Sequence, residues 1–472
     1  MNIEDISLEI LSANKALELL KKLVSEQKVN QELETAKELC KWLGYLPLGI
    51  ELVGSYLVQK SDDWTLVKIL EQLKEEKLHQ QAINPQKKEL TTAQIGVFAA
   101  LELSWLELEP ATQQVAILLS LFTADIFLRE WVESMTQSLN WDDSDVEIAI
   151  EQLSQLHFLQ FFDVDDEYHY KIHPLIREFL QIKLKASAQI KELKEAFCST
   201  LIEIALEIPH SATLELTNSL KNVIPHLKEV VENLTDTIND EDLISAFLGL
   251  AGFYYGQGLY ELAEPWYQQC ISVVKSRLGE NHPNFVIALN NLAQFYKHIG
   301  KISEAEPLYI KALELKKQLV GENHPNVVIG LNNLAFLYKS QGRYDEAETL
   351  YIKVLELRKQ LLGENHTDIA TSLNNLAQIY YSQGRFSEAE TLYIQALELK
   401  KQLLGESHPN TATSLNNLAQ LYHSQGKYDE AQPLYIQALE IGERILGSNH
   451  PHTMKYRTNL NDLRAQHLEA RN

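Results

Sequence analysis

Pairs of asparagine recur at a fixed spacing in the C-terminal half of the chain. The string Leu-Asn-Asn-Leu-Ala occurs four times, and each copy begins 42 residues after the one before it. A side-chain amide carries two donors and an acceptor, so a row of amides can hydrogen-bond the backbone of an extended peptide. The sequence therefore predicts a peptide-binding row formed by Asn290, Asn291, Asn332, Asn333, Asn374, Asn375, Asn416 and Asn417.

A second use of these amides stays open from the sequence alone. One Asn of each pair could bond a neighbouring helix and hold the units together, leaving the other to contact a peptide. Seven residues after the first Asn of each pair, the residue type changes from unit to unit, as expected for a surface adapted to one partner. These further candidates for the binding groove are Lys297, Lys339, Tyr381 and His423.

The framework around each Asn pair predicts two antiparallel helices per unit. Leu292, Ala293 and Tyr296 follow helical spacing, and Gly300 is expected to end the first helix. A capping box is expected to begin the second helix. The residue pairs of these boxes are Ser303 with Glu306, Asp345 with Glu348, Ser387 with Glu390, and Asp429 with Gln432.

This repeated frame resembles the tetratricopeptide repeat, in the 42-residue form found in the kinesin light chain family. The resemblance covers residues 243–472 and implies an α-solenoid of five units and a C-terminal capping helix. In such families, groove Asn residues contact peptides. The first copy departs from the pattern, because Leu248 and Gly249 stand where later units have the Asn pair.

Histidines also recur with the repeat. A shared metal needs ligand atoms about 2 Å from one ion, whereas successive units are separated by a helix-packing distance of roughly 8–10 Å. We therefore interpret them as turn residues and not as metal ligands: His282, His324, His366, His408 and His450.

The N-terminal part carries a different signal. An amphipathic helix is expected to end at Gly44, and Pro47 to open another. The string Leu43-Gly44-Tyr45-Leu46-Pro47-Leu48 resembles the GLPLAL motif of NB-ARC signal-transduction ATPases, in which the Pro packs against the adenine of bound nucleotide. The resemblance implies that residues 1–85 form a helical domain like the end of an NB-ARC module, with Pro47 as a nucleotide contact.

Residues 98–185 have the pattern of a winged helix. An NB-ARC module places such a domain next, with a nucleotide-sensing His in an MHD-type motif; here the residues are Ile172-His173-Pro174. An ordinary role for His173 at the end of a strand is an equal alternative. Residues 186–242 are expected to form bridging helices. The expected winged-helix elements are helices at 101–108, 112–122, 146–156 and 175–184 and strands at 158–163 and 168–173.

Charge argues against nucleic acid as a partner. The chain of 472 residues has a net charge of −23. Between Trp131 and Tyr170 it has ten acidic residues and no Lys or Arg, whereas a DNA-binding winged helix needs cations facing the phosphates. We expect no nucleic-acid binding and a regulatory or structural role for this domain.

The sequence contains no GxxxxGK[ST] phosphate-binding loop. The resemblance thus begins midway through the ATPase module, and ADP or ATP is expected to bind only with a phosphate-loop domain supplied from elsewhere. The acidic start and the short apolar runs predict no signal peptide and no membrane span, hence a cytoplasmic protein. Three isolated Cys suit a reducing compartment.

Together these features predict a mostly α protein: a helical remnant and a winged-helix domain followed by a tetratricopeptide α-solenoid. The expected function is a non-catalytic scaffold that binds a protein or peptide in the solenoid groove, as the sensor of an NB-ARC-like switch, and that oligomerises with an NB-ARC-type core. Two alternatives remain: a cargo or assembly adaptor like a kinesin light chain, and a nucleotide-binding switch completed in trans.

Overall fold

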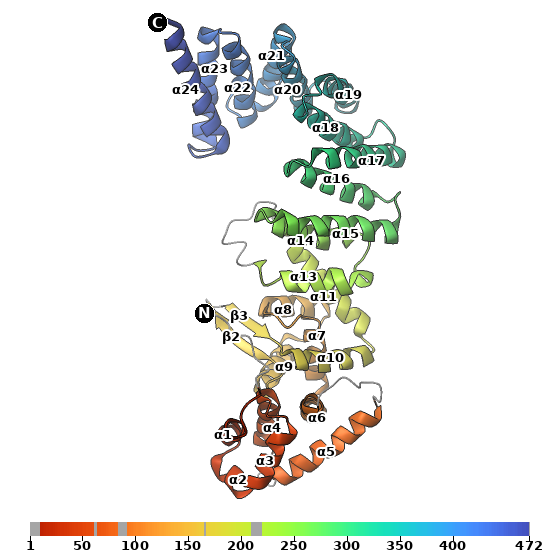
Figure 1. The fold of residues 1–472 in the computed structure, drawn as a ribbon. Helices are drawn as coiled ribbons and strands as arrows, with labels where there is room; N and C mark the ends of the chain where they lie inside the picture. The colour runs from red at the N-terminus through yellow and green to blue at the C-terminus, as the bar shows by residue number, and fades with distance from the viewer. Residues whose placement is uncertain (1–9, 61–63, 84–91, 165–166, 209–219, 472) are drawn as a thin grey trace. The chain divides into compact units, whose positions relative to one another are not determined.

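The computed structural model describes residues 10–60, 64–83, 92–164, 167–208 and 220–471 (Figure 1). It divides into two compact units, Met1–Trp266 and Tyr267–Asn472. Both are built mainly of helices, as the sequence predicts. Residues 165–166, between the two predicted strands, and the acidic start of the chain lie outside the described residues.

The first unit opens with a group of helices around α4. The chain leaves α3 through Gly44 and Tyr45, whose φ angles of 66° and 57° turn it back on itself. Pro47 is the first residue of α4, so the predicted stop and start are confirmed. Helix α4 packs on α1 and α6. The helices of this group are α1 (Ala13–Leu23), α2 (Glu26–Gln31), α3 (Leu33–Trp42), α4 (Pro47–Gln59), α5 (Leu66–Ile83) and α6 (Thr92–Leu106).

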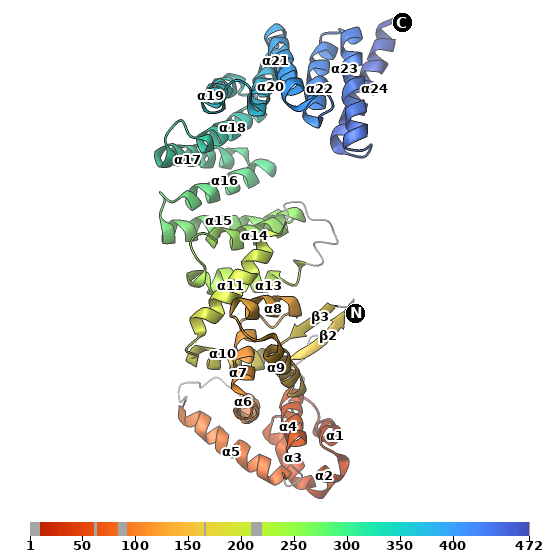
Figure 2. The ribbon, with the colours of Figure 1, turned by 180° about the vertical axis from the view of Figure 1, so that it is seen from behind.

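A small antiparallel sheet follows, with strand order β1-β3-β2. Strands β2 and β3 form the predicted hairpin, in which Phe162 pairs with His169. In both views the hairpin lies beside α9 (Figure 1, Figure 2). Strand β1 and helix α8 were not among the expected elements. The elements are α7 (Pro110–Leu119), β1 (Phe127–Leu128), α8 (Arg129–Ser138), α9 (Asp143–Gln155), β2 (Gln160–Val164), β3 (Glu167–Lys171) and α10 (Pro174–Ala186).

Helices α11 (Ile190–Leu206) and α13 (Ile224–Asn233) follow this sheet-containing segment. His226 of α13 is fully buried against an aromatic cluster, with its ring 5.1 Å from that of Phe122. Its Nδ1 accepts a hydrogen bond from the backbone N–H of Thr123 at 3.1 Å, and its Nε2 lies 3.0 Å from the carbonyl of Ile126. A neutral ring protonated at Nε2 satisfies both contacts.

The second half of the chain forms tetratricopeptide-type helix pairs, and from α16 to α24 successive helices pack in chain order. Gly300 ends the first helix of its unit at a φ of 81°, and Gly321 ends the second at 82°, as the sequence predicts. Ala305 and Ala312 are fully buried where helices approach closely. The helices are α14 (Leu243–Gly256), α15 (Tyr260–Leu278), α16 (Pro283–His298), α17 (Ile302–Val320), α18 (Pro325–Ser340), α19 (Tyr344–Leu362), α20 (Thr367–Ser382), α21 (Phe386–Leu404), α22 (Pro409–Ser424), α23 (Tyr428–Ile445) and α24 (Pro451–Arg471).

The predicted capping boxes are wrong. The second helices begin two residues earlier than the boxes require, and their N-cap residues make no side-chain capping bond. The caps are Lys301, Arg343, Arg385 and Lys427 instead of Ser303, Asp345, Ser387 and Asp429. The Glu side chains of the boxes do not cap their own helices. They bind residues of the following unit.

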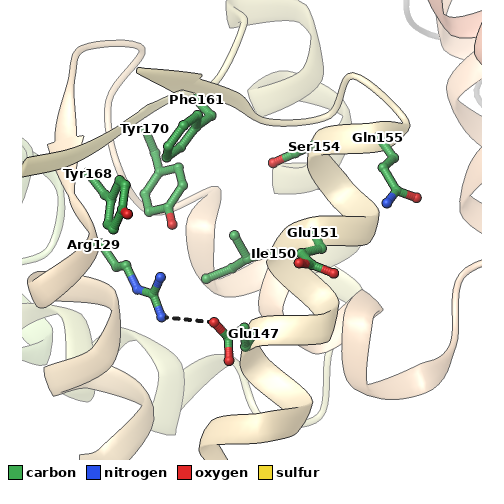
Figure 3. A pocket seen from close by; sticks show the side chains of 9 residues that line it. All are labelled: Arg129, Glu147, Ile150, Glu151, Ser154, Gln155, Phe161, Tyr168 and Tyr170. Carbon is green, nitrogen blue, oxygen red and sulfur yellow. Dashed lines mark hydrogen bonds and ion pairs between the residues drawn. The ribbon is translucent and has the colours of Figure 1, made fainter. Parts of the chain in front are cut away.

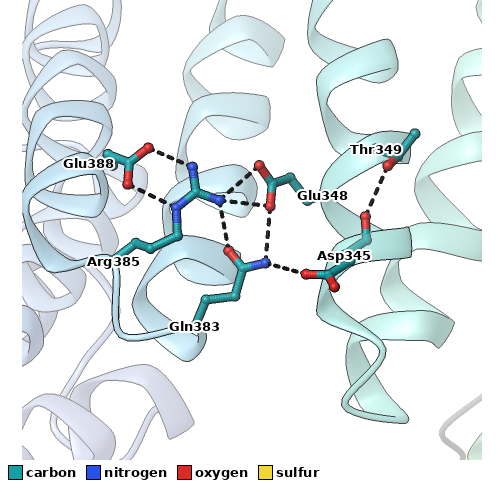
Figure 4. Close-up of polar contacts among 6 residues, drawn as sticks. All are labelled: Asp345, Glu348, Thr349, Gln383, Arg385 and Glu388. Atoms are coloured by element: carbon teal, nitrogen blue, oxygen red, sulfur yellow. Dashed lines mark hydrogen bonds and ion pairs between the residues drawn. The ribbon is translucent and has the colours of Figure 1, made fainter.

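Each of these Glu side chains joins one unit to the next. Arg385 stacks on the ring of Tyr380 at 3.9 Å and donates to both oxygens of Glu348 in the preceding unit at 2.9 Å (Figure 4). Gln383 also donates to Glu348, at 3.0 Å. Arg343 binds Glu306 in the same way, at 2.8 and 2.9 Å. In both contacts one guanidinium nitrogen, Nη1, donates to the two carboxylate oxygens, and these charge-assisted bonds help to orient one helix pair on the next.

The first copy of the repeat lacks the Asn pair for a packing reason. Helix α14 lies against α11 and α13. A Cβ atom placed on Gly249 would lie 2.6 Å from the Cβ of Ala205 in α11, so only glycine permits this approach. The position that carries Asn291 in the next unit is therefore used for packing in α14.

We predict that the pH dependence of stability in the first unit follows His226. Burial lowers the pKa of His226 to about 4, against about 6.5 when unfolded. The unfolded chain therefore binds the extra proton as the pH falls through this window, and about 3 kcal/mol of stability should be lost between pH 6.5 and pH 4. Urea unfolding followed by tryptophan fluorescence measures this, because all six Trp lie within residues 1–266.

The variant His226→Phe should fill the ring volume but lose most of the pH dependence contributed by this residue. His157→Gln in the same unit should keep the wild-type dependence. An unchanged slope in His226→Phe would contradict the assignment.

We also predict that Arg385 and Glu348 stabilise the solenoid cooperatively. A double-mutant cycle with Arg385→Gln and Glu348→Gln, measured by calorimetric unfolding, should give a favourable coupling energy, so that the double variant loses less stability than the sum of the two single variants. Glu398→Gln, an exposed carboxylate on α21, should show no coupling to Arg385→Gln. Additive effects of the first pair would mean that the contact does not hold the units together.

Candidate peptide-binding surface

The first helices of successive units present one exposed face each. We call the combined surface of α16, α18, α20, α22 and α24 the inner face. It carries the Asn pairs and the residues one and two turns further along each helix.

The Asn pairs form a hydrogen-bonded ladder along the inner face. The second Asn of one unit donates through Nδ2 to the Oδ1 of the first Asn in the preceding unit. The bonds run from Asn375 to Asn332 at 3.4 Å, from Asn417 to Asn374 at 2.9 Å, and from Asn459 to Asn416 at 2.9 Å. Asn290, at the start of the row, donates to the carbonyl of Val286 in its own helix at 2.8 Å.

The ladder uses only part of the hydrogen-bonding capacity of each amide. In Asn374 the Oδ1 accepts from Asn417, and the described residues provide no acceptor for its Nδ2. In Asn375 one N–H is used, and the described residues provide no donor to its Oδ1. Both are half-buried. Inter-unit bonding and contact with a peptide are therefore compatible uses of the same side chains.

Two lysines flank an exposed aromatic ring at one end of the inner face. The Nζ of Lys297 lies 4.6 Å from the ring centroid of Phe336, and the Nζ of Lys339 lies 5.8 Å from it. Lys339 also donates to Gln378 of the next unit. Burial lowers the pKa of both ammonium groups, so a negative charge placed beside them would be stabilised.

Tyr381 and His423 occupy the corresponding positions in later units. Tyr381 is half-buried, with its ring 6.0 Å from that of Phe386. The Nε2 of His423 lies 2.9 Å from Oε1 of Gln466 in α24. The surface thus changes from two Lys side chains at α16 and α18 to aromatic side chains at α20 and α22.

Sequence reasoning missed two apolar residues of the inner face. Ile287 is 45% exposed and Ile329 is 51% exposed. Each lies three residues before the first Asn of its unit, which is one helical turn away on the same side. The later units have Thr371 and Thr413 at this position, and this difference along the repeat was the available signal.

The recurring histidines cap helices, which agrees with their prediction as turn residues. The Nδ1 of His324 accepts from the backbone N–H of Asn326 at 3.1 Å, and His408 does the same with Asn410 at 3.1 Å. His282, His366 and His450 make equivalent bonds. Each ring satisfies a donor at the start of the next first helix.

His173 makes the same kind of cap at α10. Its Nδ1 accepts from the backbone N–H of Leu175 at 3.2 Å, and burial lowers its pKa. Pro47 lies in the first turn of α4, where its missing N–H costs no hydrogen bond. Both residues thus have local structural roles, and their contact with a nucleotide stays a prediction.

The three cysteines lie in the cores. Burial raises the pKa of the Cys40 thiol to about 11 and that of Cys198 and Cys270 to about 12. The reactive thiolate is therefore disfavoured. Within the described part of the chain, no helix combines the length and apolar character that crossing a membrane requires.

The chain carries tetratricopeptide repeats. The family model described as tetratricopeptide repeat matches residues 242–318, 284–340, 326–402, 368–441 and 410–469. These matches cover the helix pairs from α14 to α24. They account for the α-solenoid.

One curated relative is the regulatory protein AfsR of Streptomyces griseus, 25% identical over 202 residues, which are 43% of this chain and 19% of the relative. This chain spans about a fifth of the length of that relative.

Solved structures with similarity include nearly identical kinesin light chain TPR-like repeats from Podosopora anserina, at 25% identity and a TM-score of 0.40. They cover 44% of this chain and 98% of that one. Another is a Signal Transduction ATPase with Numerous Domains, with a tetratricopeptide repeat sensor, from Pyrococcus horikoshii. It has 15% identity and a TM-score of 0.36, and the match covers 96% of this chain and 62% of that one.

Proposed function

We propose that the protein is a non-catalytic interaction scaffold whose inner face binds an extended peptide segment of a protein partner. The observation that carries the proposal is the continuous amide row from Asn332 to Asn459. In the middle of the row, the half-buried Asn374 and Asn375 each keep a donor or an acceptor that the ladder does not use. A peptide backbone supplies the complementary groups.

The inner face also has a chemical preference along its length. Lys297 and Lys339 are desolvated beside the exposed ring of Phe336. Ile287 and Ile329 add exposed apolar surface nearby. A segment that places an acidic and an apolar residue at α16 and α18 would therefore bind better than a basic one.

We further propose that this scaffold is the sensor part of an NB-ARC-like switch in the cytoplasm, joined to or assembling with a phosphate-loop core. The support is the motif from Leu43 to Leu48 followed by helices and a β-hairpin in the order of a winged-helix domain. The name of the Streptomyces griseus relative, a regulatory protein, agrees with this role.

We predict that replacing Asn333, Asn375 and Asn417 together by Ala weakens peptide binding about tenfold or more, because three backbone contacts are lost. Twelve-residue peptides selected by display on the full chain are the probes, and calorimetry gives the Kd. The helical circular dichroism signal should be retained, since these residues are only half-buried.

The matched control is the triple replacement of Asn323, Asn365 and Asn449 by Ala, which makes the same change in exposed turns. Its Kd should stay at the wild-type value. Peptide affinity that survives the inner-face triple would remove this face as the binding surface.

We also predict that the chain alone does not bind ADP in calorimetry, because its sequence offers no phosphate-binding loop. If the alternative of a switch completed in trans holds, binding should appear on addition of a phosphate-loop domain and fall with His173→Ala. Micromolar binding of ADP by the chain alone would contradict the view that the site is incomplete. An adaptor like a kinesin light chain would bind peptide and stay indifferent to nucleotide in both experiments.

A further inference from the structure

A cavity of about 400 Å³ lies in the first unit between α9 and the β2–β3 hairpin (Figure 3). One wall is the side of α9 that carries Glu147, Ile150 and Glu151. The other is formed by side chains of the hairpin. The volume is at the lower end of the range of ligand-binding pockets. The proposed peptide-binding function makes no use of this cavity.

The hairpin wall is aromatic. The ring of Phe161 lies 5.4 Å from that of Tyr168 and 6.0 Å from that of Tyr170. Phe161 is 50% exposed and Tyr168 is 46% exposed. Aromatic side chains are rarely exposed to solvent as a cluster. The faces of these rings carry negative π density, which attracts a cation in the cavity.

The opposite wall is acidic. Arg129 pairs with Glu133 at 2.6 Å and with Glu147 at 3.5 Å, so its charge is already matched by two carboxylates. Glu151, one helical turn after Glu147, has no cationic partner among the described residues. The cavity therefore combines aromatic faces with a surplus of negative charge, which disfavours phosphates and other anions.

The Arg129 side chain shows which group fits such surroundings. Its guanidinium carbon lies 5.7 Å from the centroid of the Tyr168 ring while the same group binds Glu147. A guanidinium is planar, stacks on aromatic rings and donates several hydrogen bonds to carboxylates. A second guanidinium entering the cavity would find Phe161 and Tyr170 on one side and Glu151 on the other.

We propose that this cavity binds an arginine side chain of a partner protein, held between the aromatic wall of the β2–β3 hairpin and Glu151 of α9. The first unit thus recognises the partner through an arginine that the partner supplies. This site is independent of the amide row in the second.

The test uses the full chain and N-acetyl-arginine-N-methylamide as the probe, with saturation-transfer difference NMR as the readout. Saturation should reach the δ-methylene protons next to the guanidinium. The citrulline analogue, which has the same shape without the charge, should show a roughly fivefold weaker signal. Phe161→Leu and Glu151→Gln should each reduce the arginine signal to a similar extent. Both residues are exposed, so neither change empties the core.

Glu203→Gln, an exposed carboxylate of α11 outside the cavity, is the charge-matched control and should leave the signal unchanged. Equal signals from arginine and citrulline would overturn the proposal, as would a loss in Glu203→Gln equal to that in Glu151→Gln. So would undiminished binding in both cavity variants. Failure here would leave the inner-face experiment unaffected, because that experiment probes a different unit with a different ligand.

Discussion

The contact between a glutamate of one unit and an arginine of the next orients the solenoid. Arg343 and Arg385 each bind a carboxylate of the preceding unit while stacking on a tyrosine of their own. Apolar packing between helices tolerates small rotations. The guanidinium of Arg385 restricts them, because Glu388 of its own unit holds Nε and Nη2 while Nη1 donates to Glu348 of the preceding unit. The inner-face amides can meet at hydrogen-bonding distance only if successive first helices keep one rotation. The Glu–Arg contact between units and the amide ladder therefore depend on the same rotation of one helix pair relative to the next.

This arrangement changes how the Asn pairs are understood. Peptide binding and bonding between units seemed to be alternatives, yet one amide can do both because it has more donors and acceptors than the ladder uses. The ladder orients each amide before a ligand arrives, which reduces the side-chain entropy lost on binding. At the first repeat the ladder is absent, because Gly249 is pressed against Ala205 of α11.

Much of the fold follows from local rules visible in the sequence. Glycine after a helix and proline at the start of one placed the end of α3 and the starts of α4, α16, α18 and α22 correctly. The capping boxes failed because a Glu three residues into a helix has two choices of partner. The spacing of Ser303 and Glu306 shows the local one, and Arg343 supplies a stronger one 37 residues later. The sequence did not predict helix α8, because in this short helix only three apolar residues, Trp131, Val132 and Met135, mark the buried side.

The acidic stretch between Trp131 and Tyr170 shows a similar limit in predicting function from sequence. Its charge alone argued against binding to a phosphate backbone, and it did not indicate which carboxylates are paired. In the fold, however, Arg129 enters from just outside the stretch and pairs with Glu133 and Glu147, while the hairpin brings Phe161 and Tyr168 opposite Glu151. The carboxylates of the stretch thus have at least two distinct environments, one paired with Arg129 and one facing the aromatic side chains. The composition of the stretch indicates that the domain repels anions. The ion pairs of its carboxylates and the shape of the cavity determine where a cation can bind.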